Sequence, residues 1–330
     1  MNVPVKSYAQ RNLTSFMDAL APLRAVFDDE SVREIMINGP SDVFIRQRGP
    51  DQRYEVELSA NAIRTAITIL ASISDKVVDS ERLTLSGRLP GLRIEACLPP
   101  VAVKGPSMCV RRHATSIFTF EDYIKAKTIT TQQARVIEGL IAKQKNVLIA
   151  GGTYSGKTTL MNCVLSLIDP DQRLFVIEQV QELRIAAPNH VLVECDPEQG
   201  VTARTAVRMG MRYSPHRVIL GELRGEEAND WLDACNTGHP GSCATIHADG
   251  AADALQRLES LVLMAKTGMP YEAIQARIGS SVHAVLFIEQ KNGERRLSQI
   301  CHIDGFDRVR GEYKTATTTY GEASCPHPTN

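Results

Sequence analysis

Apolar residues in the first third of the chain follow helical and strand periods in turn. Residues 11–27 and 59–74 carry apolar side chains three or four positions apart, which predicts two helices, the second opened by Ser59. Four short apolar runs bounded by glycine or proline predict strands: residues 33–39, 42–48, 91–101 and 107–113. The pattern therefore predicts a small α+β domain over residues 1–115.

From about residue 131 the pattern changes to short apolar runs that alternate with helical patterns. The predicted strands are 146–151, 173–179, 190–195 and 217–222. The predicted helices are 157–168, 202–213 and 225–238. Such alternation favours an α/β fold with a mostly parallel sheet covered on both faces. We expect a linker over 116–130, this second domain over 131–312 and a frayed polar tail over 313–330.

Composition limits the classes of function. The 330 residues suit two domains, and the 43% apolar and 23% charged residues are typical of globular proteins. A net charge of −1 argues against a generally basic nucleic-acid binder, so we expect no sequence-specific nucleic-acid binding. The eight cysteines include no C-x-x-C pair, which argues against a zinc ribbon or a thioredoxin-like site.

Apolar runs also bear on where the protein works. Residues 1–16 lack the apolar core of a secretory signal. The longest apolar runs are far shorter than the roughly 20 residues that span a bilayer. We therefore expect a cytoplasmic protein whose membrane contact is peripheral or made through a partner.

The stretch Gly151-Gly152-Thr153-Tyr154-Ser155-Gly156-Lys157-Thr158-Thr159 matches the phosphate-binding pattern G-x-x-x-x-G-K-[ST]. An apolar strand precedes it and a helical pattern follows it, as that pattern requires. Backbone N–H groups and the helix N-terminus attract phosphate oxygens, Lys157 reaches the outer phosphates, and the Thr158 hydroxyl is a Mg²⁺ ligand. The sequence therefore predicts a nucleotide site that uses ATP and Mg²⁺.

Acidic side chains and one histidine follow predicted strands of the same domain. Glu222 ends the run 217–222. Glu178 lies near the end of the run 173–179 and Glu182 follows it, four residues on. His247 follows a run of small residues. Ligands in open α/β sheets bind at the carboxyl ends of the strands, where an acid can hold Mg²⁺ or orient water and a histidine can sense the outer phosphate. The alternative is that these are surface carboxylates and a structural histidine.

Arginines of the first domain are candidates to stabilise the charge that develops on a transferring phosphoryl group. They are Arg93, Arg111 and Arg112. Taken alone, they are better explained as ordinary surface residues.

Several stretches together resemble the secretion ATPase superfamily, which includes the ATPases of type IV secretion, type II secretion and type IV pili. The resemblance lies in four boxes in the order of that superfamily: GGTYSGKTTL, IEQVQEL, the ILGELRG of the third box and the TIHA of the fourth. The stretches FDDESVREIMINGPSDVFI, GRLPGLRIEACLPPV and FTFEDYI resemble the TrbB-type conjugal-transfer ATPases in particular. The resemblance covers roughly residues 20–310.

This resemblance implies an N-terminal domain followed by a RecA-like P-loop ATPase domain. It implies a ring of six protomers, peripheral at the cytoplasmic face of the inner membrane and in contact with type IV secretion components. It also implies that ATP binds where the two domains meet. Carried over by position, Glu222 polarises the attacking water, Glu178 positions water or metal, His247 lies near the γ-phosphate, and Arg93 and Arg111 reach the nucleotide.

Three positions depart from the family pattern. Tyr154 replaces the usual glycine of the loop, Gln179 replaces an acid, and His216 replaces an aspartate. If the backbone at Tyr154 needs a positive φ, a non-glycine residue there is strained by roughly 1–3 kcal/mol. We expect His216 to pair locally, and Gln179 to remove one negative charge near the metal.

Three hypotheses remain. The first is a hexameric ATPase that powers conjugative pilus assembly or substrate transfer. The second is a pilus-retraction or type II secretion motor, although the absent C-x-x-C module argues against the latter. The third is a nucleotide-gated ring with weak or no hydrolysis, which Tyr154 and Gln179 suggest.

Overall fold

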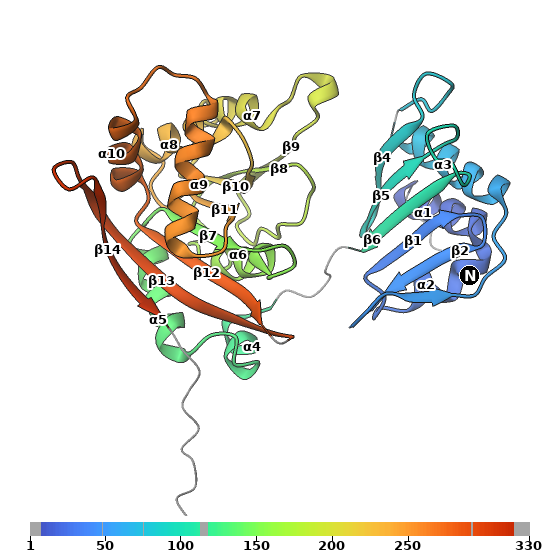
Figure 1. Cartoon of the computed structure of the whole chain (residues 1–330), viewed down its shortest axis with the longest axis horizontal. Helices are drawn as coiled ribbons and strands as arrows, with labels where there is room; N and C mark the ends of the chain where they lie inside the picture. The colour runs from blue at the N-terminus through green and yellow to red at the C-terminus, as the bar shows by residue number, and fades with distance from the viewer. Residues whose placement is uncertain (1–7, 48, 75, 113–117, 292, 320–330) are drawn as a thin grey trace, which may run out of the picture. The chain divides into compact units, whose positions relative to one another are not determined.

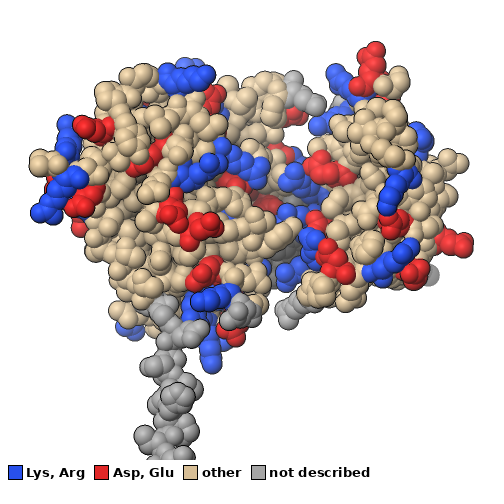
Figure 2. Space-filling model, in the orientation of Figure 1, with Lys and Arg blue, Asp and Glu red and all other residues tan. Residues whose placement is uncertain are grey.

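The computed structural model describes residues 8–47, 49–74, 76–112, 118–291 and 293–319. The chain divides into two compact units, residues 1–115 and 116–330. Acidic and basic side chains are interspersed over the visible face of each unit (Figure 2). Within the described ranges, no helix is both long and apolar enough to cross a lipid bilayer.

The first unit is an antiparallel sheet with helices packed on one face (Figure 1). Its helices are α1 (Tyr8–Ala19), the 3₁₀ turn η1 (Ala21–Leu23), α2 (Arg24–Asp28) and α3 (Ala60–Ile73). Its strands are β1 (Glu34–Gly39), β2 (Asp42–Arg46), β3 (Gln52–Tyr54), β4 (Thr84–Leu89), β5 (Leu92–Cys97) and β6 (Ser107–Arg112). They lie in the order β3-β2-β1-β6-β5-β4, and each adjacent pair is antiparallel.

Burial alternates along these strands, as a sheet with one covered face requires. Leu92, Ile94 and Ala96 of β5 face the core, whereas Arg93 and Glu95 face away from it. The helix predicted from residue 59 begins as expected, because the Ser59 hydroxyl accepts the N–H of Ala62 at 3.1 Å. The helix predicted over 11–27 is interrupted at the Ala21-Pro22 step, since proline lacks the N–H that a continuous helix would use.

The second unit is a sheet with helices on both faces. Its helices are α4 (Phe120–Lys125), α5 (Thr131–Ala142), α6 (Lys157–Leu165), η2 (Pro197–Gln199), α7 (Ala203–Gly210), α8 (Glu227–Asn236), α9 (Ala251–Met264) and α10 (Tyr271–Ser281). Its strands are β7 (Val147–Gly151), β8 (Leu174–Glu178), β9 (His190–Glu194), β10 (Arg217–Leu223), β11 (Cys243–His247), β12 (Ala284–Lys291), β13 (Glu294–Asp307) and β14 (Glu312–Thr319).

The strands of this second sheet follow the order β14-β13-β12-β7-β11-β10-β8-β9. The pairs from β12 to β9 are parallel, and the pairs β12–β13 and β13–β14 are antiparallel. Successive residues of β7 belong to two separate cores: Leu148 and Ala150 to one, Val147 and Ile149 to the other. Both faces of β7 are therefore buried, and its carboxyl end is held rigidly.

The prediction of a frayed tail is wrong for residues 313–319, because β14 forms the edge of the sheet beside β13. The Tyr313 hydroxyl donates to the buried Glu259 carboxylate at 2.6 Å, and its ring packs on Phe306. An edge strand is held by backbone hydrogen bonds, so the threonine-rich stretch needs no apolar pattern to join the sheet. The rest of the expected tail, residues 320–330, lies outside the described residues.

The expected linker contains a short helix. Helix α4 lies within residues 116–130 and begins with a capping box, in which Thr119 and Asp122 satisfy each other's backbone N–H groups. Tyr123 of this helix is buried in the same core as β7. The described part of this segment is thus packed against the second unit.

A buried arginine ties together the end of the second sheet that lies opposite the loop. The Arg217 guanidinium donates to the carbonyl oxygens of Gly241 and Ile141 at 3.2 and 3.0 Å, and to the Gln172 side chain at 2.5 Å. Burial lowers the pKa of Arg217 from its ordinary value. Gly241 has φ +77°, and a side chain there would collide with the guanidinium. This contact joins three segments that are distant in sequence.

Candidate functional site

The glycine-rich loop lies at the carboxyl end of β7 and leads directly into α6. Gly156 occupies the N-cap position of α6 with φ +99°, a conformation that favours glycine. A side chain at Gly151 would collide with the carbonyl oxygen of Ile288 and with the Ser155 hydroxyl. Gly151 and Gly156 are therefore required by the path of the backbone. The first backbone N–H groups of α6 have no partners within the helix, as an anion site needs.

Lys157 is bound to its own loop in this structure. Its side chain is 8% exposed, and its Nζ donates to the carbonyl oxygens of Gly151 and Gly152 at 2.9 and 2.7 Å. Burial lowers the pKa of the Lys157 ammonium, and the Glu222 carboxylate opposes that shift. A phosphate that enters the loop must replace these two carbonyl oxygens as the partners of the ammonium.

Glu222 and His247 are brought together beside Lys157. His247 lies level with Gly151 on the neighbouring strand β11, and its Nε2 is 3.0 Å from Glu222 Oε1. The Lys157 Nζ is 3.4 Å from both ring nitrogens of His247. A lysine, a histidine and a carboxylate thus form one continuous group at the carboxyl ends of three adjacent strands.

The electrostatics of this group favour a neutral imidazole. Burial and the Lys157 cation lower the pKa of His247, and Glu222 opposes them. Because the ordinary histidine pKa is 6.5, a lowered value leaves the ring neutral at pH 7. We assign its proton to Nε2, which faces the Glu222 carboxylate; this assignment follows from the hydrogen-bond partners.

The second oxygen of Glu222 is held by an arginine that also contacts the unusual glutamine. Arg224 donates to Glu222 Oε2 at 2.7 Å and to Gln179 Oε1 at 2.6 Å. An amide oxygen at position 179 therefore accepts an arginine N–H near the candidate base, where the family pattern has an acid. The Glu222 side chain remains 20% exposed, so water can reach it.

Glu178 shapes the loop that follows its strand. Its Oε1 accepts the backbone N–H groups of Glu182 and Leu183, both at 2.9 Å, and the residue is 7% exposed. Its side chain packs against Gly221, which precedes the Glu222 carboxylate. The structure thus gives Glu178 a role in holding a loop, and its role toward water or metal stays a prediction.

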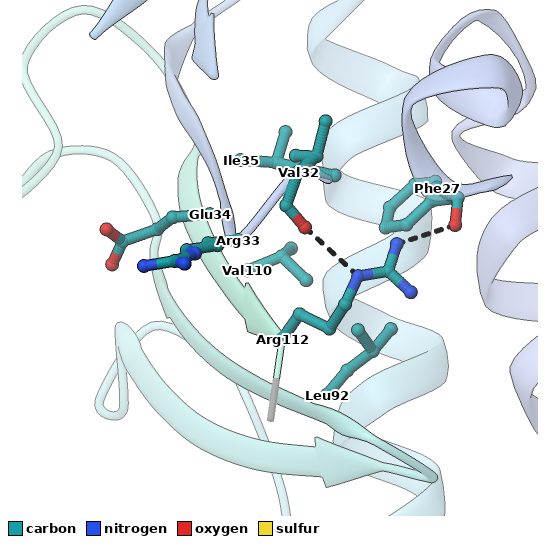
Figure 3. A pocket seen from close by; sticks show the side chains of 8 residues that line it. All are labelled: Phe27, Val32, Arg33, Glu34, Ile35, Leu92, Val110 and Arg112. Carbon is teal, nitrogen blue, oxygen red and sulfur yellow. Dashed lines mark hydrogen bonds between the residues drawn. The ribbon is translucent and has the colours of Figure 1, made fainter. Parts of the chain in front are cut away.

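The arginines of the first unit fall into two kinds. Arg93 and Arg111 stand directly opposite each other on β5 and β6, and Arg93 pairs with Glu95 at 3.0 Å. Arg112 instead turns toward the core side and donates to the carbonyl oxygens of Phe27 and Val32 at 2.7 and 3.1 Å, beside a small pocket (Figure 3). Arg112 therefore has a structural role, whereas the roles of Arg93 and Arg111 toward a nucleotide stay predictions.

The departures from the family pattern are accommodated locally. Tyr154 has φ +62° and its side chain is half exposed, so the strain expected for a non-glycine residue in a left-handed turn is present. His216 pairs locally, as expected: its Nδ1 accepts the N–H of Arg173 at 2.7 Å. Neither residue removes a backbone N–H from the loop.

Sequence reasoning missed a second acid that shapes the site. Glu227 is 6% exposed, and its Oε1 accepts the N–H groups of Arg224 and Gly225 at 2.6 and 2.8 Å. It therefore fixes the turn that aims Arg224 at Glu222. Its neighbour Glu226 looks the same in sequence, and only the start of α8 distinguishes the two.

The sequence predicts Mg²⁺ at this site, with the Thr158 hydroxyl as its ligand. Across the ranges that the structure describes, no three histidine, cysteine or acidic side chains are grouped to hold a metal ion. Burial raises the pKa of the Cys163 thiol, on the helix that follows the loop, to about 12, which makes it a poor ligand. Thr158 is the second residue of α6, and its role as a Mg²⁺ ligand stays a prediction.

Comparisons with known proteins agree with this geometry. A family model described as Type II/IV secretion system protein matches residues 17–329. The chain is 36% identical over 289 residues to the conjugal transfer protein TrbB of Rhizobium radiobacter, across 86% of this chain and 87% of that one. It is 32% identical over 310 residues to the type IV secretion system protein PtlH of Bordetella pertussis, across 84% and 91%.

The solved structures add a likeness of fold. The X-ray structure of the Legionella pneumophila ATPase DotB matches with a TM-score of 0.59 at 20% identity, over 93% of this chain and 81% of that one. At that identity the likeness shows the fold alone.

Proposed function

Because the chain belongs to the Type II/IV secretion system protein family, we propose that it is a hexameric ATPase that hydrolyses ATP to power conjugative type IV secretion. Its similarity to TrbB and PtlH extends over most of each chain and supports the type IV branch. In this proposal the second unit is the RecA-like ATPase domain.

One observation carries the proposal. The Lys157 ammonium, the His247 ring and the Glu222 carboxylate are in contact at the mouth of a glycine-rich loop. A phosphate-binding cation, a group near the outer phosphate and a half-shielded base are the parts that hydrolysis needs. A ring that only binds nucleotide has no need of the carboxylate at this place.

The reaction follows from these positions. Lys157 leaves the loop carbonyls and pairs with the β- and γ-phosphate oxygens. Glu222 accepts a proton from a water whose oxygen bonds to the γ-phosphorus, while the bond from that phosphorus to the bridging oxygen breaks and ADP leaves. The Thr158 hydroxyl would hold Mg²⁺, which would neutralise charge on the phosphates.

The remaining residues have supporting roles in the proposal. His247 orients the Glu222 carboxylate and lies near the γ-phosphate. Glu178 holds the neighbouring loop, and Arg93 and Arg111 supply positive charge to the nucleotide. The hexamer works with inner-membrane type IV secretion components, at the cytoplasmic face and peripheral to the membrane, without sequence-specific nucleic-acid binding.

Phosphate release from Mg-ATP, paired with native mass measurements, tests this function. We expect turnover that needs Mg²⁺, and a six-fold mass in the presence of ATP. Lys157→Ala supplies the background, because it removes the loop cation. Hexamers that bind ATP and release no phosphate above that background would instead favour the nucleotide-gated ring. If the protein hydrolyses ATP and its gene lies beside pilus-retraction genes and not beside conjugation genes, a retraction motor is favoured.

Tyr154→Gly tests how the loop tolerates its unusual residue. Glycine adopts the left-handed turn without the strain that a Cβ atom causes, and the loop binds phosphate through backbone N–H groups that this change keeps. We expect Mg-ADP affinity to change by less than about tenfold (~1.4 kcal/mol), with equal or tighter binding. The free energy of unfolding should rise by about 1 kcal/mol. Calorimetric titration and thermal unfolding measure the two effects, and weaker binding would reveal a contact made by the ring.

A further inference from the structure

Arg295, near the start of β13, packs against the phosphate-binding loop. Its Nη2 donates to the carbonyl oxygen of Tyr154 at 3.4 Å, across 141 positions of sequence. Its side chain also covers Gly156: a Cβ atom there would lie 3.3 Å from Arg295 Cδ and 3.4 Å from Nε. The loop is thus closed on its outer side by a residue of the β12–β13 hairpin.

The charge of Arg295 is not neutralised by an ion pair with a described acid, and its field opposes the burial that raises the pKa of Tyr123. Its Nε is buried and has no hydrogen-bond partner among the described residues, and the described acids make no ion pair with it. Its position is set by the strand: Leu297, two residues on, donates to Thr128 at 2.9 Å and accepts from the Gln133 side chain at 2.6 Å. The guanidinium is therefore held against the loop by packing and not by an acid.

Tyr154 is the part of the loop that needs such support. Its φ of +62° is a conformation that side chains with a Cβ disfavour, and a turn of this kind persists only where the surroundings hold it. The Arg295 contact is made to the backbone oxygen of this residue. Without it, the free loop would spend more time in other conformations.

We propose that Arg295 is a positioning residue of the phosphate-binding loop, which holds the left-handed turn at Tyr154 and so sets how tightly the loop binds nucleotide. This inference rests on the proposed function, because it concerns the same nucleotide site. Affinity falls in proportion to the fraction of molecules whose loop is competent to bind. The clamp matters here because the chain carries tyrosine where glycine would adopt the turn unaided.

Arg295→Met tests the clamp, because methionine keeps packing over Gly156 and removes the charge and the donors. We expect it to weaken Mg-ADP binding about tenfold by calorimetric titration. In a Tyr154→Gly background the same change should weaken binding by less than about threefold. Arg296→Met is the matched control, since Arg296 is the next residue of the strand and points to the opposite face.

The outcomes separate the alternatives. An equal loss in both backgrounds would mean that Arg295 acts on the phosphates or on folding, and would overturn the clamp. Unchanged affinity in Arg295→Met would overturn it as well. Arg295→Lys keeps the positive charge and loses the planar guanidinium, so its Mg-ADP affinity should lie between those of the unchanged protein and Arg295→Met. A wild-type protein that does not bind Mg-ADP would overturn the proposed function too, whereas the preceding outcomes leave that function standing.

Discussion

Replacing Glu222 by glutamine should slow ATP hydrolysis by about 10²–10⁴-fold, the usual contribution of a general base. Glutamine keeps the shape of the side chain, so its amide oxygen can still accept from Arg224. It cannot take a proton from water at neutral pH. Nucleotide binding should persist, because the loop and Lys157 are unchanged. Phosphate release at saturating Mg-ATP, together with Mg-ADP titration, measures the two effects separately.

Glu182→Gln is the matched control for this change. Glu182 follows the adjacent strand β8, and its backbone, not its carboxylate, takes part in the contacts with Glu178 and Asn162. We expect turnover within about twofold of the unchanged protein, as for surface substitutions. If Glu222→Gln hydrolyses ATP as fast as this control, Glu222 is not the base, and a different acid or direct attack by water must be considered.

Arg217→Met should destabilise the second unit by about 2–4 kcal/mol. The change removes the three hydrogen bonds of the buried guanidinium, to the Gln172 side chain and to the carbonyl oxygens of Gly241 and Ile141, at roughly 1–3 kcal/mol each. The Ile141 oxygen still accepts the N–H of Gln144 at 3.1 Å. Part of that loss is offset, because burying the guanidinium is itself unfavourable. A unit of this size should melt roughly 5–15 °C lower. Trp231, the single tryptophan, is fully buried in α8, so its emission reports this unit alone.

Arg212→Met controls for the loss of an arginine as such. Arg212 is exposed and lies five residues before Arg217, so its replacement should shift stability by no more than about 0.5 kcal/mol. Equal melting temperatures for the two variants would show that the buried hydrogen bonds of Arg217 contribute little. Urea unfolding followed at Trp231 gives the same comparison without heating.

The sequence predicted the parts of the site that are local in the chain. The loop and the start of the helix that follows it could be predicted because ten consecutive residues, 151–160, contain the whole motif. The strand that carries Glu222 could be predicted for the same reason. The contact between Glu222 and His247 was not predicted, since the two residues are brought together only by the pairing of β10 with β11.

Other parts could not be read from local pattern. Arg295 reaches the loop because β12 pairs with β7 and returns as β13, an order of strands that periodicity does not reveal. Strand β14 lacks an apolar pattern because an edge strand is held by its backbone. The distinction between Arg111 and Arg112 depends on which face of β6 each side chain takes, and the core alone decides that.

The edge position of β14 also determines what the loss of this strand would cost the sheet. Removing residues from 312 onward would strip β13 of its outer partner and leave a row of unpaired backbone groups, a surface on which other chains can add a strand. It would also leave the buried Glu259 carboxylate without the Tyr313 hydroxyl. The eight residues of β14 therefore complete the backbone pairing of β13 and supply a hydrogen bond to a buried carboxylate.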